Sequence, residues 1–406
     1  MTLITLGIVI LFIACEISLI MYYLIKDKGY IPISERLLKE KNVYVRNITE
    51  KKDECSYLDT LFPHPYLAFV HHSNEPCGIE DINNIGLFGP DYRSEKYDDK
   101  YVILVTGGSV AAQFAQMRKD GPKYLQCILN DQYINSGKEF LILNGGDGAW
   151  KYPQQLILFI LYADVIDAII TIDGFNENYM LGSNLRFEYP ANNFLEVNPL
   201  LNNGYKRLLG GFLRTKISNI SKNNWFLSHS HFAYYLTKSL RKAVRSWEKS
   251  VIFDNSKTTI QSIFALPKDW NDEKKFYWSI GQYKKYIRMI NYIAKDMNIK
   301  VSHFIQPVPA IHKNLTIEEK SVVGDLSYGE VYFKMTDELL TLRNEAIPIF
   351  SLLDIYENVS ETIYSDHIHC NKSPSGESLG YKIMAERIAE MIEKPWVLRK
   401  KTTYIK

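Results

Sequence analysis

The chain has 406 residues, and its hydrophobic content of 46% is typical of one large or two modest folded domains and excludes a disordered chain. With 48 Lys and Arg against 46 Asp and Glu, the formal net charge of +2 gives no electrostatic reason to expect nucleic acid as a partner. The five cysteines contain no C-x-x-C pair, so no zinc ribbon or thioredoxin-type site is indicated.

The first 25 residues form a nearly unbroken apolar segment, interrupted by one charge, Glu16. Residues 3–25 are long enough to cross a bilayer as a helix. A cleaved signal peptide would need a basic start, a shorter apolar core and a small-residue cleavage site, and none of these is evident. We therefore predict a single-pass transmembrane anchor over residues 1–25.

The flanking charges bear on which side of the membrane the body of the protein lies. No Lys or Arg precedes the apolar segment, whereas six follow it within about 20 residues, and this bias favours a cytoplasmic body. Cys55 and Cys77 would pair only in an exported domain, and two unpaired thiols fit the sequence equally well.

Residues 26–95 carry loop signals and no strong periodicity, which predicts a stalk and lead-in segment. From residue 96 to 395 buried apolar runs alternate with helical patterns, as in parallel strands that helices cover on both faces. We predict a three-layer α/β/α domain with a five-stranded parallel sheet, followed by a basic tail over 396–406. The expected strands are 101–106, 139–144, 167–172, 300–307 and 347–356, and the expected helices include 109–118, 122–133, 153–163, 330–345 and 378–393.

The alternation is interrupted at about 180–270, a stretch rich in Asn, aromatic and basic residues without an evident strand, which we interpret as an insertion. Inside it, apolar residues from Phe232 to Val251 recur at helical spacing, and Lys and Arg occupy the rest of the helix. Such a basic amphipathic helix near an anchor either lies against anionic lipid or caps the domain with a solvated face.

The stretch "YVILVTGGSVAAQF" joins a strand to a helix through two glycines and a serine. Gly107 and Gly108 permit a sharp turn, and Ser109 then stands at the helix N-terminus, where negative charge is favoured. A phosphate site would use the same geometry. The Walker pattern and the three-glycine dinucleotide pattern are both absent, however, which favours an attacking serine or a plain strand-to-helix turn over a phosphate site.

The stretch "SDHIHC" follows the fifth expected strand. Asp366 and His369 are three residues apart, so the carboxylate can orient the imidazole. His367, His369 and Cys370 are the alternative, as metal ligands, but they are too few for a site of their own and no H-E-x-x-H motif is present. Surface histidines without a role are the third interpretation.

All the candidate residues follow predicted strands, so they belong to the same edge of the sheet. A serine nucleophile needs a base, the base needs an orienting group, and the oxyanion needs hydrogen-bond donors. Asn176 in "DGFN" offers a side-chain amide. The backbone N–H groups of Ser109 and of the Gly148–Ala149 turn offer further donors.

The ordered blocks "GGS", "NGGDGAWKYPQQL", "DGFNENY" and "SDHIH" resemble those of the SGNH (GDSL-type) hydrolase superfamily, over residues 83–179 and roughly 300–393. The resemblance implies a flavodoxin-like fold with Ser109 as nucleophile, His369 as base, Asp366 as its orienting residue and Asn176 as oxyanion donor. No metal or other cofactor is implied.

Two positions depart from the pattern of the superfamily. The first block reads "GGS" where many relatives have "GDS". The glycine of the second block falls on Ala149, with Gly148 one residue earlier, and a backbone N–H from either would serve as donor.

From these features we predict a membrane-anchored serine esterase that forms an acyl-enzyme and acts on an O-acylated cell-envelope carbohydrate or another small ester. The resemblance to anchored bacterial members implies the outer face of the cytoplasmic membrane, against the flanking charges. An O-acyltransferase, a non-catalytic glycan-binding assembly protein and nucleotide binding at the "GGSVAA" turn are the alternatives. The oligomeric state is left open.

Overall fold

A computed structural model describes residues 2–26, 29–30, 32–33, 60–72, 82–115, 124–134, 137–191, 193–194, 209, 212–213, 216–217, 229–252, 256–373 and 376–401. The chain divides into two compact units, which are described one at a time. The first comprises Met1–Thr60, Glu75–Ile79 and Leu195–Ile260, and the second comprises Leu61–Asn74, Glu80–Phe194 and Gln261–Lys406.

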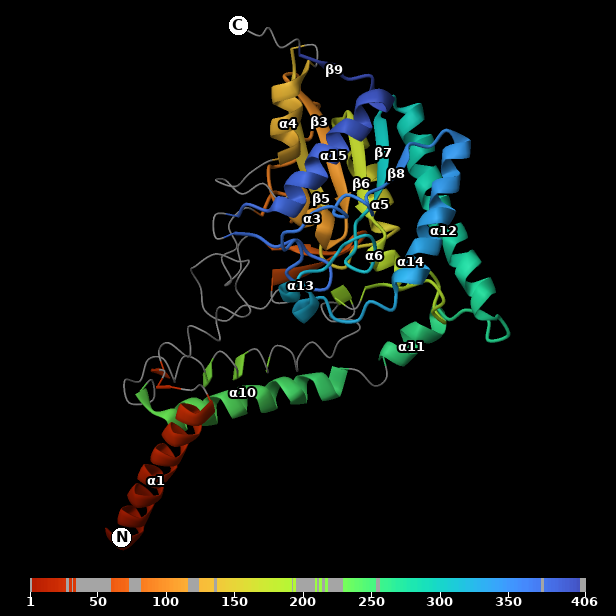
Figure 1. Cartoon of the computed structure of the whole chain (residues 1–406). Coiled ribbons are helices and arrows are strands. Elements are labelled where there is room, and N and C mark those ends of the chain that lie inside the picture. The colour runs from red at the N-terminus through yellow and green to blue at the C-terminus, as the bar shows by residue number, and fades with distance from the viewer. Residues whose placement is uncertain are drawn as a thin grey trace, which may run out of the picture. The chain divides into compact units, whose positions relative to one another are not determined.

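The second unit is built on a five-stranded sheet in which all strands are parallel (Figure 1). Every residue of the central strand β6 is buried, in keeping with its mostly apolar sequence AIITID. The predicted parallel sheet is confirmed. In spatial order the strands are β5 (Glu139–Gly146), β3 (Lys100–Gly107), β6 (Ala168–Asp173), β7 (Lys300–Ile305) and β8 (Ile349–Ser351).

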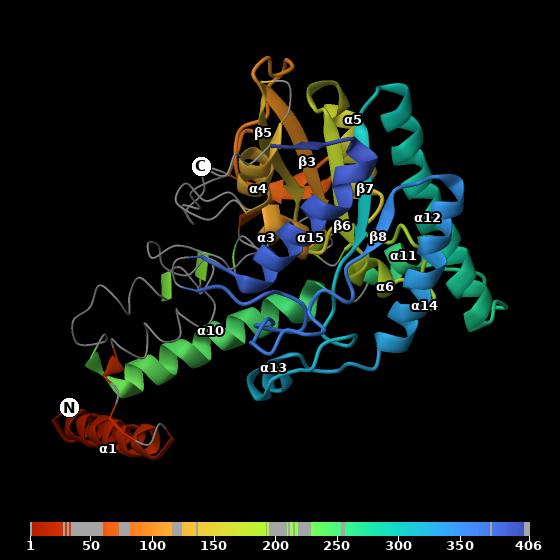
Figure 2. The ribbon, with the colours of Figure 1, turned by 45° about the horizontal axis from the view of Figure 1, so that its top comes forward.

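Helices cover both faces of this sheet and give the predicted three layers (Figures 1 and 2). On one face α15 packs against α4, and a ring contact joins it to α3; on the other face α12 packs against α5 and α14. The helices of the first face are α3 (Ser109–Ala115), α4 (Tyr124–Gln132) and α15 (Leu379–Trp396), and those of the second are α5 (Gln154–Tyr162), α12 (Asp272–Asp296) and α14 (Gly329–Leu340).

Short elements connect these layers. The turns η2 (Ala163–Val165) and η3 (Thr341–Glu345) extend α5 and α14. Two helices lie in the loops that follow β6 and β7, namely α6 (Phe175–Asn178) and α13 (Ile317–Val322). The helix α11 (Ser256–Ile263) precedes α12.

Three segments differ from the sequence-based expectation. The lead-in segment contains an antiparallel hairpin of β1 (Leu61–His64) and β2 (Ala68–His71), and the expected basic tail begins with β9 (Arg399–Lys400), which pairs with β4 (Tyr133–Ile134). Strands of two to four residues are too short for a periodicity to show. The fifth sheet strand is limited to three residues, because turns follow directly after Ser351.

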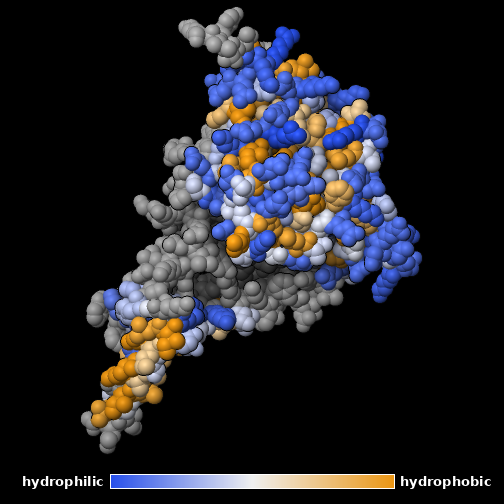
Figure 3. All heavy atoms as spheres, in the orientation of Figure 1, coloured by the Kyte–Doolittle hydropathy of each residue, from blue (hydrophilic) through white to orange (hydrophobic). Residues whose placement is uncertain are grey.

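In the first unit, α1 (Thr2–Lys26) packs against α10 (His231–Ile252), the helix expected from the spacing of apolar residues in the insertion. The helix α1 is long and apolar enough to cross a membrane, a test that an N-terminal signal sequence passes as well. Its surface is largely hydrophobic (Figure 3). Cys55 and Cys77 lie outside the described residues.

Candidate active site

The strand register brings the three loops that carry the first three sequence blocks to one edge of the sheet. Gly107 at the end of β3 pairs with Gly146 of β5 and with Ile172 of β6. Because parallel strands all run the same way, the residues that follow them emerge together at the carboxyl edge. The loops after β3, β5 and β6 therefore share the carboxyl edge of the sheet.

Ser109 is the first residue of α3, directly after the turn at Gly107 and Gly108. Gly107 has a φ of +152°, and a Cβ atom there would lie 2.0 Å from the carbonyl oxygen of Ile172. Only glycine lets β3 turn into the helix without displacing the neighbouring strand. The turn leaves the Ser109 side chain half-buried at the edge of the sheet.

His369 lies between Ser109 and Asp366, although 260 positions separate it from the serine. Its Nε2 is 2.7 Å from Ser109 Oγ, and its Nδ1 is 2.8 Å from Asp366 Oδ2. In the tautomer that donates Nδ1–H to the carboxylate, Nε2 accepts the hydrogen bond of the serine hydroxyl. The three side chains thus form one hydrogen-bonded chain.

The Asp366 carboxylate is held in its ionised form. Its Oδ1 accepts hydrogen bonds from the backbone N–H groups of Ile368 (2.9 Å) and His369 (2.8 Å). Burial by itself would raise the pKa of Asp366, but the His369 side chain and the two backbone donors outweigh burial and hold that pKa well below its usual range. The carboxylate therefore keeps its charge and fixes the orientation of the imidazole.

Asn176 lies in α6, and its side-chain amide is directed at the serine turn. Its Nδ2 donates a hydrogen bond to the carbonyl oxygen of Trp150, at 2.7 Å. An amide carries two hydrogens, so one more can be donated. A Cβ atom on Gly108 would lie 2.3 Å from this nitrogen, which places the amide against the residue before Ser109. Glycine at position 108 thus leaves room for the amide.

The two backbone donors expected after β5 differ in their surroundings. The N–H group of Gly148 already donates to Asp147 Oδ1, at 2.6 Å. Ala149 has a left-handed backbone with a φ of +61°, and its N–H group has no hydrogen-bond acceptor among the described residues. Of the two, Ala149 is the residue whose N–H group is free to donate a hydrogen bond to an oxyanion.

A buried contact between a histidine and a carboxylate holds the loop of Asp147 in place. His71 Nε2 lies 3.1 Å from Asp147 Oδ1, and the side chains are 0% and 2% exposed. His71 is the last residue of the β1–β2 hairpin, and no pattern in the sequence assigned it a role. The only available signal was an apolar run, "LAFV", that ends at this histidine.

A second buried carboxylate, Glu177, ties the Asn176 turn to the loop after β5. Its Oε2 accepts from the N–H of Gly174 (2.8 Å), and its Oε1 accepts from the N–H of Tyr152 (3.2 Å). Burial raises the pKa of Glu177 and, more strongly, that of Asp173, to which the Tyr283 hydroxyl donates. The positions of Asn176 and of the 149–152 loop are thus set by a shared partner.

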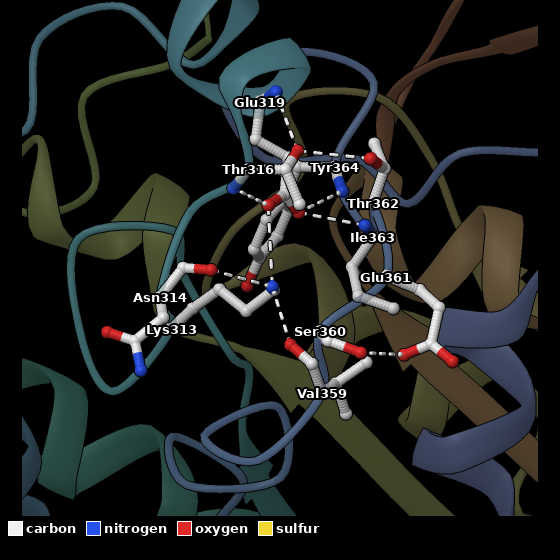
Figure 4. A network of polar contacts seen from close by, with 10 residues as sticks. All are labelled: Lys313, Asn314, Thr316, Glu319, Val359, Ser360, Glu361, Thr362, Ile363 and Tyr364. Atoms are coloured by element: carbon white, nitrogen blue, oxygen red, sulfur yellow. Dashed lines mark hydrogen bonds and ion pairs between the residues drawn. The ribbon is translucent and has the colours of Figure 1, made fainter.

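A third polar network holds the segment that leads into "SDHIH" (Figure 4). Glu319 of α13 accepts from the backbone N–H groups of Ile363 (2.8 Å) and Tyr364 (3.0 Å), and Lys313 Nζ lies 3.4 Å from its Oε2. The Lys313 and Glu319 side chains are 1% and 0% exposed. Lys313 also donates to the carbonyl oxygen of Val359, at 2.8 Å, so both ends of the 359–364 segment are fixed.

The metal alternative for "SDHIHC" finds no support in the surroundings of these residues. Both ring nitrogens of His369 are hydrogen-bonded within the chain of three side chains. Burial raises the pKa of the Cys370 thiol to about 12, which keeps it protonated, whereas a metal binds the thiolate. The described residues contain no group of three or more His, Cys, Asp or Glu side chains that could hold a metal ion.

A serine, an imidazole and a carboxylate in one chain of hydrogen bonds is the arrangement that serine hydrolases use. No protein-family model and no curated protein matches the sequence. A solved structure from Bacteroides fragilis, described as an acylhydrolase, is similar at 11% identity and a TM-score of 0.34, over 74% of this chain and 90% of that chain.

Two further solved structures are similar to the same extent. One is a GDSL-like lipase from Bacteroides thetaiotaomicron, with 10% identity and a TM-score of 0.33 over 74% of this chain and 92% of that chain. The other is the acetyl xylan esterase AlAXEase, with 12% identity and a TM-score of 0.31 over 72% of this chain and 98% of that chain. Similarity this weak decides nothing about activity.

Proposed function

We propose that the protein is a serine esterase that works through an acyl-enzyme. The observation that carries this proposal is the chain of hydrogen bonds from Ser109 Oγ through His369 to Asp366. A serine hydroxyl is a weak nucleophile by itself, and a positioned imidazole with an ionised partner is the standard way of activating it.

In the first half-reaction, Ser109 Oγ attacks the ester carbonyl carbon while its proton passes to His369 Nε2. The imidazolium is stabilised by Asp366. The oxyanion of the tetrahedral intermediate accepts hydrogen bonds from the backbone N–H groups of Ser109 and Ala149 and from Asn176 Nδ2. Collapse of the intermediate expels the alcohol, which takes the proton from His369 and leaves an acyl group on Ser109.

In the second half-reaction, water gives a proton to His369 and attacks the acyl-enzyme. The same donors stabilise the second tetrahedral intermediate, and its collapse releases the carboxylic acid and restores the Ser109 hydroxyl. An O-acyltransferase would use the same acyl-enzyme with a sugar hydroxyl in place of water. Product analysis with and without an acceptor alcohol distinguishes the two.

For the substrate we propose an O-acylated carbohydrate, with the catalytic unit on the outer face of a bacterial cytoplasmic membrane. Aromatic rings near His369 support the proposal of a carbohydrate substrate. Phe175, next to Asn176 in the chain, has its ring centroid 5.2 Å from that of Tyr179 and 5.7 Å from that of His367, whose ring lies 6.1 Å from His369. Tyr179 is 66% exposed, so an aromatic ring three residues after Asn176 is open to solvent.

Hydrolysis of short acyl esters by the full chain tests the esterase itself. We expect Ser109→Ala and His369→Ala each to lower kcat by about 10⁴-fold or more, and a fluorophosphonate probe to label the wild type but not Ser109→Ala. A wild-type rate no higher than that of both variants would overturn the proposal and favour a non-catalytic glycan-binding protein.

Substitution of Tyr179 tests the carbohydrate separately. Tyr179→Ala should raise KM for an acetylated sugar and leave ethyl acetate hydrolysis unchanged. Tyr292→Ala is the matched control, because Tyr292 has the same exposed fraction of 66% and lies near the end of α12 that packs toward the amino edge of the sheet. Equal effects of both variants, or none, would exclude the aromatic surface from sugar binding.

A further inference from the structure

The one charge inside the apolar sequence of α1 has defined partners in the structure. Glu16 accepts hydrogen bonds from the backbone N–H groups of His231 (2.6 Å) and Phe232 (2.9 Å) and from Ser230 Oγ (2.7 Å). His231 Nδ1 also lies 3.3 Å from the carboxylate. All these donors belong to the start of α10. A carboxylate from one helix therefore caps the first turn of another.

Neither group would be stable alone in an apolar layer. The N–H groups of a first helical turn have no partner within the helix, and a charged side chain is costly in lipid unless it is paired. The carboxylate and the helix N-terminus also attract each other electrostatically. The contact therefore avoids both an unpaired charge and unpaired N–H groups in the apolar layer. It can form only if the first turn of α10 lies at the same depth in the membrane as Glu16.

Packing along one stripe of α1 extends the contact. The rings of Phe12 and Phe232 are 5.5 Å apart, and those of Tyr23 and Tyr234 are 5.8 Å apart. Phe12, Glu16 and Tyr23 recur at the spacing of one helix face. Tyr23 and Tyr234 are 5% and 4% exposed and form a small core with Ile33 and Leu19.

On the other faces of α1 and further along α10, several apolar side chains of the described residues are exposed. In α1 the exposed apolar side chains include Leu6, Ile10, Ile17 and Ile25. In α10, Leu236 (47% exposed) and Leu240 (44% exposed) lie one turn apart on a common face, and Trp247 (39% exposed) follows on it. Lys238 and Lys242 of α10 are also exposed.

We propose that α1 and α10 form a single membrane-binding unit whose partner is an anionic lipid bilayer. The first turn of α10 is inserted beside α1 at Glu16. Beyond it, Leu236, Leu240 and Trp247 contact acyl chains, and Lys238 and Lys242 reach phosphate headgroups. In this arrangement α1 is a structural partner of α10 as well as a tether. The proposal is independent of the esterase activity.

Limited trypsin digestion of the full chain tests the proposal, with the protein reconstituted in vesicles and the cleavage sites identified by mass spectrometry. Trypsin cuts after Lys238 and Lys242 when α10 leaves the membrane. We expect Glu16→Ala to speed these cuts about tenfold, in line with the loss of a helix cap. Ser18→Ala is the matched control, because among the described residues the Ser18 hydroxyl donates only to the carbonyl oxygen of Ala14 in its own helix. Equal cleavage rates in the two variants would refute the proposed role of the Glu16 contact.

Lipid composition tests the partner. Cleavage of the wild type at Lys242 should be several-fold slower in vesicles of phosphatidylcholine with phosphatidylglycerol than in phosphatidylcholine alone. Leu236→Asp combined with Leu240→Asp should remove this difference. If the wild type is cleaved at the same rate with and without phosphatidylglycerol, α10 is a solvated cap and the lipid assignment is refuted.

If Glu16→Ala fails to fold, Glu16→Gln replaces it, because glutamine keeps a hydrogen-bond acceptor but carries no charge. This variant should be cleaved at a rate between those of Glu16→Ala and the wild type. Cleavage of Glu16→Gln at the wild-type rate would overturn the role of the charge.

Discussion

Replacement of Gly108 by alanine tests the proposed role of Asn176 through sterics alone. Gly108 has no positive φ, so alanine is compatible with its backbone. The new Cβ atom would lie 2.3 Å from Asn176 Nδ2, whereas ordinary contact begins at 3.4 Å, so the amide has to retreat by about 1 Å. The carbonyl oxygen of Trp150, 3.1 Å from the same Cβ, blocks part of the space and would lose its hydrogen bond.

The expected cost is that of one misplaced oxyanion donor, about 10²- to 10³-fold in kcat, or roughly 3 to 4 kcal/mol of transition-state stabilisation. KM should change little, because the donor acts on the charge that develops during attack. Steady-state hydrolysis of a short acyl ester gives both constants. Gly281→Ala in α12 is the control, since a Cβ there meets nothing within 4 Å.

A double variant makes the prediction sharper. If Gly108→Ala acts by displacing the amide, adding Asn176→Ala should cost almost nothing further, because the donor is already lost. Two independent losses would instead multiply. The reasoning is refuted if Gly108→Ala keeps activity within about threefold of the wild type, or if the second substitution lowers kcat by another hundredfold.

Three further predictions follow from the charges in this unit. Asp366→Asn keeps the shape of the carboxylate but not its charge, and kcat should fall by about 10⁴-fold in ester hydrolysis; a loss below tenfold would contradict its assigned role. Glu319→Ala leaves Lys313 buried without its carboxylate partner and should lower the free energy of unfolding in urea by about 3 to 5 kcal/mol. The double variant Lys313→Met with Glu319→Gln should recover most of this loss. Equal losses in the single and double variants would show that the ion pair does not stabilise the fold. Burial lowers the pKa of His303 from 6.5 to about 3, so the unfolded chain binds more protons between these values, and the stability from the neutral ring is complete above pH 6.5 and lost as the pH falls toward 3. His303→Gln should therefore make the free energy of unfolding less dependent on pH in that window, by up to about 1.4 kcal/mol per pH unit. Groups whose pKa is shifted the other way, such as Asp173, act equally in both proteins. If the free energy of unfolding changes with pH equally in both proteins, His303 is protonated in the folded protein as it is in the unfolded chain.

Much of the second unit could be predicted because its signals are local. A strand that helices cover on both faces is mostly apolar, so β3, β5 and β6 stand out as apolar runs, and β7 is recognisable although Ser302 and His303 interrupt it. A chain that turns sharply from such a strand into a helix needs glycine, which marks the turn before Ser109. The carboxyl edge of a parallel sheet then follows from chain direction alone.

The contacts between distant segments were decided by the tertiary structure. Whether His369 meets Ser109 across 260 positions depends on strand order and register, which no local pattern encodes. Ala149 rather than Gly148 is the candidate oxyanion donor because the N–H group of Gly148 already donates to the Asp147 side chain. Asp147 is in turn held by His71. A hairpin of two four-residue strands leaves no periodic trace.

The helix pair of the first unit illustrates the same division. The sequence by itself determined an apolar helix with one carboxylate and, more than two hundred residues later, an amphipathic helix with a basic face. Only the folded chain paired the Glu16 carboxylate with the free N–H groups that begin α10. Periodicity is set by the immediate neighbours of each residue, whereas the partner of a buried charge is set by whichever segment the whole chain brings within hydrogen-bonding distance.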